Sequence, residues 1–155
     1  MPREFLAREA VSAPSGEVLV CGCRQEDVAV LEEVFGREGS SVRPVDEPAE
    51  MARQVVLRLP LAVFLGLRKR DRARLQIIPV LRAAWRELAV MVVADEESLE
   101  LERRVRQEGI FYYFVHPLGS AEVQAVSRDL LRRAAREIAP RPVAGEDVRK
   151  KRSEP

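Results

Sequence analysis

The residues that follow the apolar segments of this chain are the ones placed to do chemistry. In a parallel α/β sheet, ligands and reacting groups lie outside the carboxyl ends of the strands. The residues expected there are Gly22, Cys23, Gly66, Val93 and His116. None of them carries a carboxylate, the group that a hard cation such as Mg²⁺ prefers. The sequence therefore predicts a sheet edge without acidic chemistry.

A thiol and an imidazole are the reactive groups left at this edge. Cys23 and His116 are expected to lie near one another, with Cys21 two residues earlier, and such soft ligands suit zinc, copper or a redox role. Structural zinc usually takes four ligands, and no third group is evident to orient a Cys–His nucleophile. A packing role for both residues is therefore favoured, no cofactor is predicted, and the thiol or metal site stays an alternative.

A basic segment follows the third apolar run and is a second place where a ligand could bind. Its cations are Arg68, Lys69, Arg70, Arg72 and Arg74. Guanidinium groups fork onto phosphate oxygens, so a sensor of a small anion or nucleotide is a further alternative. A solvated loop is the more common use of such a segment, and Asp71 dilutes its charge.

Composition narrows the class of protein. The chain has 155 residues and a formal net charge of +1, which fits one domain and gives no electrostatic footprint for nucleic acid. The apolar runs are of strand length and the N-terminal segment is polar, so neither a membrane span nor a secretion signal is expected, and a cytoplasmic location is predicted. Residues 1–16 are expected to be a flexible extension, 17–139 the domain, and 140–155 a disordered charged tail.

Strand and helix patterns alternate along the domain, which predicts an α/β fold with a parallel sheet covered on both faces. The expected strands are 18–21, 41–45, 61–65, 89–93 and 111–115. The expected helices are 26–37, 46–59, 75–88, 98–108 and 120–138. Pro79 is expected to disturb the third helix near its beginning.

Three segments resemble response-regulator receiver domains. Residues 105–117 (VRQEGIFYYFVHP) are similar to the fourth helix and fifth strand of that family, 60–67 (PLAVFLGL) to its third strand, and 18–23 (VLVCGC) to its first. The resemblance spans about residues 17–139. It implies a flavodoxin-like, CheY-like sheet of order 2-1-3-4-5.

The same resemblance implies that the functional groups of a receiver phosphorylation site are missing from the strand ends. Gly66 takes the place of the phosphorylated aspartate, and Gly22 and Cys23 that of the acidic pair that helps to hold Mg²⁺. Val93 matches a hydroxyl-bearing residue and His116 a lysine. The sequence thus resembles a degenerate pseudo-receiver of two-component signal transduction, not an enzyme, with neither aspartyl phosphorylation nor Mg²⁺ binding.

In receivers, the surface formed by the fourth helix, fifth strand and fifth helix is where partners dock, and it is the candidate interface here. A strand-five aromatic, matched by Tyr113, turns in or out with activation in that family. The charged residues expected on this face are Arg103, Arg106, Arg128, Asp129 and Arg132. Mixed charges of this kind suit a protein partner or a two-fold homodimer, while nucleic acid is unlikely as a partner.

Overall fold

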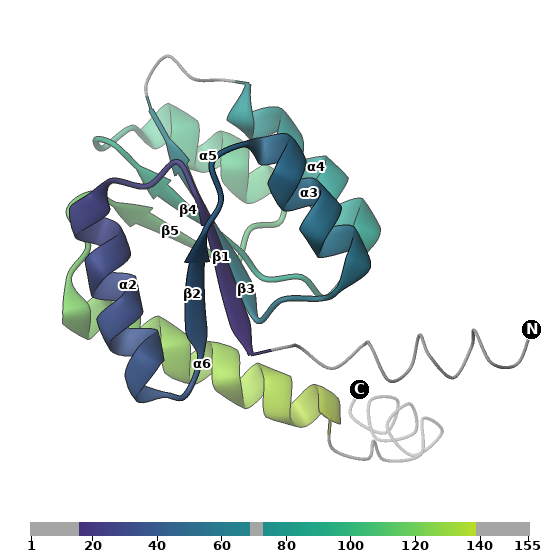
Figure 1. Ribbon diagram of the computed structural model, residues 1–155. Helices are drawn as coiled ribbons and strands as arrows, with labels where there is room; N and C mark the ends of the chain where they lie inside the picture. The colour runs from purple at the N-terminus through teal and green to yellow at the C-terminus, as the bar shows by residue number, and fades with distance from the viewer. Residues whose placement is uncertain (1–15, 69–72, 139–155) are drawn as a thin grey trace, which may run out of the picture.

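The computed structural model describes residues 16–68 and 73–138, which form a sheet between two layers of helices (Figure 1). The strands are β1 (Glu17–Cys21), β2 (Ser41–Pro44), β3 (Ala62–Leu67), β4 (Val90–Ala94) and β5 (Tyr112–Val115). The helices are α2 (Gln25–Arg37), α3 (Pro48–Leu57), the 3₁₀ turn η1 (Arg74–Gln76), α4 (Ile77–Ala84), α5 (Leu99–Gln107) and α6 (Ser120–Ile138).

All strand pairs are parallel and the order is β2-β1-β3-β4-β5, which confirms the predicted architecture. The register places Val18 opposite Ala62, and Gly66 opposite Val93. β3 is buried along its whole length, as expected for a central strand covered on both faces. The carboxyl ends of β1, β3 and β4 therefore meet at one edge of the sheet.

Each face of the sheet has its own apolar core. Helices α3, α4 and α5 cover one face, packing residues such as Met51, Ile78 and Val105 onto the strands. Helices α2 and α6 cover the other face with Leu31, Val123 and their neighbours. These two layers hold the strands rigidly and fix the loops at the carboxyl edge.

The third predicted helix differs from the observed one. It was expected to run through Trp85 and Leu88, but α4 ends at Ala84, and Trp85 is extended with φ −143°. The indole Nε1 of Trp85 donates to the carbonyl oxygen of Val55 at 2.6 Å, which links the end of α4 to α3. The predicted helix begins as the 3₁₀ turn η1, and Pro79 lies in the first turn of α4, where no intrahelical N–H bond is needed.

The flexible extension predicted for residues 1–16 and the disordered tail predicted for 140–155 lie outside the described residues, except for Gly16. Within 16–68 and 73–138, no helix is both long enough and apolar enough to cross a bilayer.

Candidate functional site

The five strand-end residues singled out in the sequence lie together at the carboxyl edge. They line one cavity of about 10 Å³ between β1, β3 and β4: Gly22, Cys23, Gly66, Val93 and His116. A cavity of this size holds at most one water molecule. The edge is therefore filled by the protein itself.

Backbone from the turn after β1 occupies the space beside Gly66. A Cβ atom on Gly66 would lie 2.5 Å from the carbonyl carbon of Gly22, closer still to its oxygen, and 2.8 Å from the amide nitrogen of Cys23. Gly22 has φ +82°, a conformation that glycine adopts at little cost. Position 66, which lies inside β3 and not after it, thus has no room even for a methyl group.

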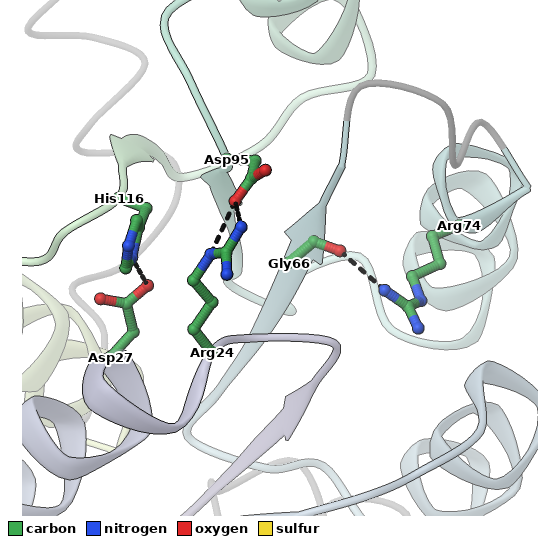
Figure 2. Close-up of polar contacts among 6 residues, drawn as sticks. All are labelled: Arg24, Asp27, Gly66, Arg74, Asp95 and His116. Atoms are coloured by element: carbon green, nitrogen blue, oxygen red, sulfur yellow. Dashed lines mark hydrogen bonds and ion pairs between the residues drawn. The ribbon is translucent and has the colours of Figure 1, made fainter.

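A guanidinium from η1 closes the same contact from the other side. Arg74 Nη1 donates to the carbonyl oxygen of Gly66 at 3.3 Å (Figure 2). A Cβ on Gly22 would lie 2.7 Å from Arg74 Cζ. The sequence placed Arg74 in a solvated basic loop, whereas the structure turns it onto the sheet edge.

The expectation of an edge without acids is wrong, and the first acid is Asp95. It directly follows β4 and binds Arg24 from the turn after β1, with Nε–Oδ1 and Nη2–Oδ1 distances of 2.8 and 2.6 Å (Figure 2). The hydrogen bond and the charge of Asp95 raise the pKa of Arg24. This pair spans the edge and joins the β1–α2 turn to the β4–α5 loop.

The second acid is Asp27, which is 1% exposed. Its Oδ2 lies 2.6 Å from His116 Nδ1, and its Oδ1 accepts the backbone N–H of Leu118 at 3.0 Å. Asp27 shares the buried face of α2 with Leu31 and Val34, at spacings of four and seven residues. An acid on an apolar helix face was the sequence signal for this contact, because buried carboxylates need partners.

Burial changes the chemistry of Cys23. It raises the pKa of the thiol to about 12, and the negative charge of Asp27 adds to the effect. The thiol therefore stays protonated at neutral pH, whereas nucleophiles and metal ligands need the thiolate. This disfavours the thiol or metal alternative built on Cys23 and His116.

The edge does not fit Mg²⁺ either. Its two carboxylates, Asp27 and Asp95, are already bound to other protein groups, and positions 22, 23 and 66 offer no side-chain oxygen. Across 16–68 and 73–138, no cluster of three or more His, Cys, Asp or Glu side chains could hold a metal ion.

We expect alkylation of Cys23 by iodoacetamide at pH 8 to be at least about 100-fold slower in the folded protein than in urea, because so little thiolate is present. Mass spectrometry of peptides after timed quenching measures this rate, and Cys21, which is fully buried, serves as the internal reference. Equal rates in folded and unfolded protein would contradict the buried environment of the thiol.

The anion-binding alternative is weakened by the surroundings of Arg68. Lys69 and Arg70 lie outside the described residues. Arg68 lines a cavity of about 330 Å³ together with one more cation, Arg104, and four acids: Asp95, Glu96, Glu97 and Glu100. Carboxylates in such number oppose the binding of a phosphate-like group.

The candidate partner face is formed by α5, β5 and α6. Arg103 and Arg128 are exposed. Arg106 binds Glu102 at 2.8 Å, and Arg132 lies 3.5 Å from Asp129, so both pair within their own helices. The ring of Tyr113 is turned inward, 7% exposed, with its hydroxyl 3.5 Å from the carbonyl oxygen of Ser98.

Comparison with known proteins supports the fold. No protein-family model matches the sequence, and no curated protein matches it. Solved structures do match. The NtrC4 receiver domain dimer in its beryllofluoride-activated form is 13% identical, with a TM-score of 0.68 over 77% of this chain and 98% of that one. A CheY-like protein, TadZ, from Pseudomonas aeruginosa is 14% identical, with a TM-score of 0.62 over 74% and 98%. A pilus assembly-related protein from Burkholderia pseudomallei is 20% identical, with a TM-score of 0.60 over 85% and 96%.

Proposed function

We propose that this chain, which has the fold of response-regulator receiver domains, is a signalling module that acts by binding protein partners, without aspartyl phosphorylation or Mg²⁺ binding. The observation that carries the proposal is the backbone contact between Gly22 and Gly66. A side chain at position 66 is absent, and the space that it would need is taken. Phosphoryl transfer to this position thus lacks both a nucleophile and a cavity.

The fixed contacts at the edge suggest how such a module works without a covalent input. The Arg24–Asp95 pair holds the β4–α5 loop against the β1–α2 turn. Ser98 of the same loop lies against the inward hydroxyl of Tyr113. In receivers this aromatic changes position with activation. Here we propose that internal ion pairs, and not a phosphoryl group, keep the α5–β5–α6 face in one arrangement that partners recognise.

Two of the compared proteins are described by name as assembling with protein. One of them is a receiver dimer and another is pilus assembly-related by name. On the α5–β5–α6 face, Arg106 and Arg132 already bind acids of their own helices, which leaves less charge for any partner there. Arg103 and Arg128, which are exposed, are the cations of this face that we propose a protein partner contacts.

Incubation with acetyl phosphate and Mg²⁺ tests the proposal. We expect the intact mass to stay unchanged, because no carboxylate is available at position 66. The Gly66→Asp variant, examined in the same way, is expected to give no adduct either if it folds, since the Gly22 backbone blocks the site. A stable acyl-phosphate adduct on the natural chain would overturn the proposal, and a receiver domain with its aspartate intact provides the positive control.

A further inference from the structure

A cavity of about 330 Å³ lies between the end of β3, the turn η1 and the start of α5. Sites for small molecules in proteins begin at about this size, whereas the neighbouring cavity at Gly66 has about 10 Å³. The closed edge therefore leaves room for a ligand beside it, although not inside it.

Three leucines form the apolar part of the cavity lining. They are Leu67 from β3, Leu75 from η1 and Leu101 from α5, and all three pack in the core on this face of the sheet. Leu67 and Leu75 are 2% and 7% exposed. The side chain of Ser98 accepts the backbone N–H of Leu101 at 3.1 Å, which holds the first turn of α5 in place. An aliphatic group in the cavity would thus contact a surface that the core keeps rigid.

Charges of both signs form the rest of the lining. The acids are Asp95, Glu96, Glu97 and Glu100, and the cations are Arg68 and Arg104. The carboxylate of Asp95 is already bound by Arg24 (Figure 2). Because the sequence continues from Arg68 with three more cations, Lys69, Arg70 and Arg72, the acids alone do not set the sign of this region. A ligand that carries both charges suits the cavity better than a simple cation or anion.

Two of these charges, Glu100 and Arg104, stand at the spacing and in the order that favour an ion pair on a helix. Glu102 and Arg106 have the same spacing in the same helix and bind at 2.8 Å. Glu100 and Arg104 line the cavity and make no ion pair, either with one another or with another residue of 16–68 and 73–138. A carboxylate and a guanidinium group thus face the same cavity from side chains whose Cβ atoms are about 5–6 Å apart.

We propose that this cavity binds an aliphatic α-amino acid in its zwitterionic form. The ammonium group donates to Glu100, and the carboxylate accepts from Arg104, whose planar fork matches a carboxylate. The side chain of the ligand packs on the three leucines. Both charges of an α-amino acid are attached to one carbon atom, so they fit between two side chains that are one helical turn apart. This site does not depend on the proposed function.

Titration of the isotope-labelled full chain with L-leucine, L-isoleucine and L-methionine, followed by amide NMR, tests the site. We expect at least one of the three to shift the amide signals of Ser98 and Leu101 with saturation, at a dissociation constant below about 1 mM. The proposal is contradicted if none gives a saturable shift up to about 10 mM. Shifts spread evenly over the surface would contradict it as well.

Analogues of the tightest amino acid show whether both charges and the apolar body are used. For L-leucine these are isopentylamine, which lacks the carboxylate, isocaproate, which lacks the amine, and glycine, which lacks the aliphatic side chain. We expect each to bind at least about 10-fold more weakly. An amine that binds as tightly as the amino acid would indicate a site for a simple cation, and an equally tight isocaproate a site for an anion. Either result overturns the two-charge site.

Glu100→Gln and Arg104→Gln remove the two charged contacts one at a time. Both residues are exposed, so the fold is expected to stay intact, and thermal unfolding checks this. We expect each variant to bind the amino acid at least about 10-fold more weakly than the natural chain. Glu102→Gln is the matched control, because it removes an acid of the same helix that does not line the cavity, and its affinity is expected to stay within about 2-fold. Unchanged binding by Glu100→Gln and Arg104→Gln, or an equal loss in Glu102→Gln, would show that the ligand is not held by these two side chains.

Discussion

Replacing Gly66 with alanine is expected to lower the free energy of unfolding by about 3 kcal/mol, with the midpoint of urea denaturation falling accordingly. The added methyl group meets the carbonyl group of Gly22 and the amide nitrogen of Cys23, both parts of the backbone. A flexible side chain could rotate away, but these backbone atoms move only if the turn after β1 lifts off β3. The Arg24–Asp95 ion pair and the buried contacts of Asp27 hold that turn and the start of α2 in place.

Gly36→Ala is the matched control. A Cβ at Gly36 meets nothing within 4 Å, and the residue lies in α2 with an ordinary helical backbone. Alanine favours helix over glycine, so this variant is expected to gain roughly 0.5–1 kcal/mol. If Gly66→Ala is as stable as Gly36→Ala, the turn after β1 does not rest on β3, and the case for a closed site fails.

The size of this effect also bears on function. A receiver that had merely lost its aspartate would regain it by one substitution, because the pocket would remain. Here the position is closed by the Gly22 backbone and capped by Arg74, so Gly66→Asp is expected to disrupt the fold before it restores any chemistry. The contacts of Gly22 and Arg74 at Gly66 therefore stabilise a closed edge that one substitution does not reopen.

Long, regular patterns in the sequence predicted the fold well. The last helix is found with its expected bounds, Ser120–Ile138, because nineteen residues of uninterrupted periodicity leave few alternatives. The sheet order also follows the resemblance to receivers. The end of α4 could not be found in this way, since the periodicity of Trp85 and Leu88 continues while the indole bonds to α3 and not to its own helix.

The sequence predicted only part of what lies at the carboxyl edge. The five strand-end residues do line one cavity, but the polar contacts that fill the edge come from residues distant in sequence. Asp27 reaches His116 across 89 positions, and Arg24 reaches Asp95 across 71. The position of Asp27 on an apolar helix face signals that it needs a partner, but no local pattern says which residue that partner is. Likewise Gly22 and Gly66 were visible as missing acids, while their backbone contact depends on how the turn after β1 folds over the sheet.

Replacing Asp27 with alanine is expected to lower the free energy of unfolding by about 3 kcal/mol, measured by urea denaturation at neutral pH. The carboxylate is buried and accepts from two groups, His116 and the backbone N–H of Leu118. Its loss leaves the Leu118 N–H in a buried position without an acceptor. It also releases the imidazole, and with it the contact that ties α2 to the turn between β5 and α6.

Two further variants separate these contributions. Asp27→Asn keeps an oxygen for the Leu118 N–H but loses the charge facing His116, so its stability is expected to fall between that of Asp27→Ala and the natural chain. Asp129→Ala removes an exposed aspartate whose Arg132 contact is at 3.5 Å, and it is expected to change stability by less than about 0.5 kcal/mol. If Asp27→Ala costs no more than Asp129→Ala, the buried contact does not hold the edge together. We expect Asp27→Ala to be the most destabilised variant, Asp27→Asn the next and Asp129→Ala the least. This order would show that the Asp27 carboxylate is a main stabilising contact of the closed edge.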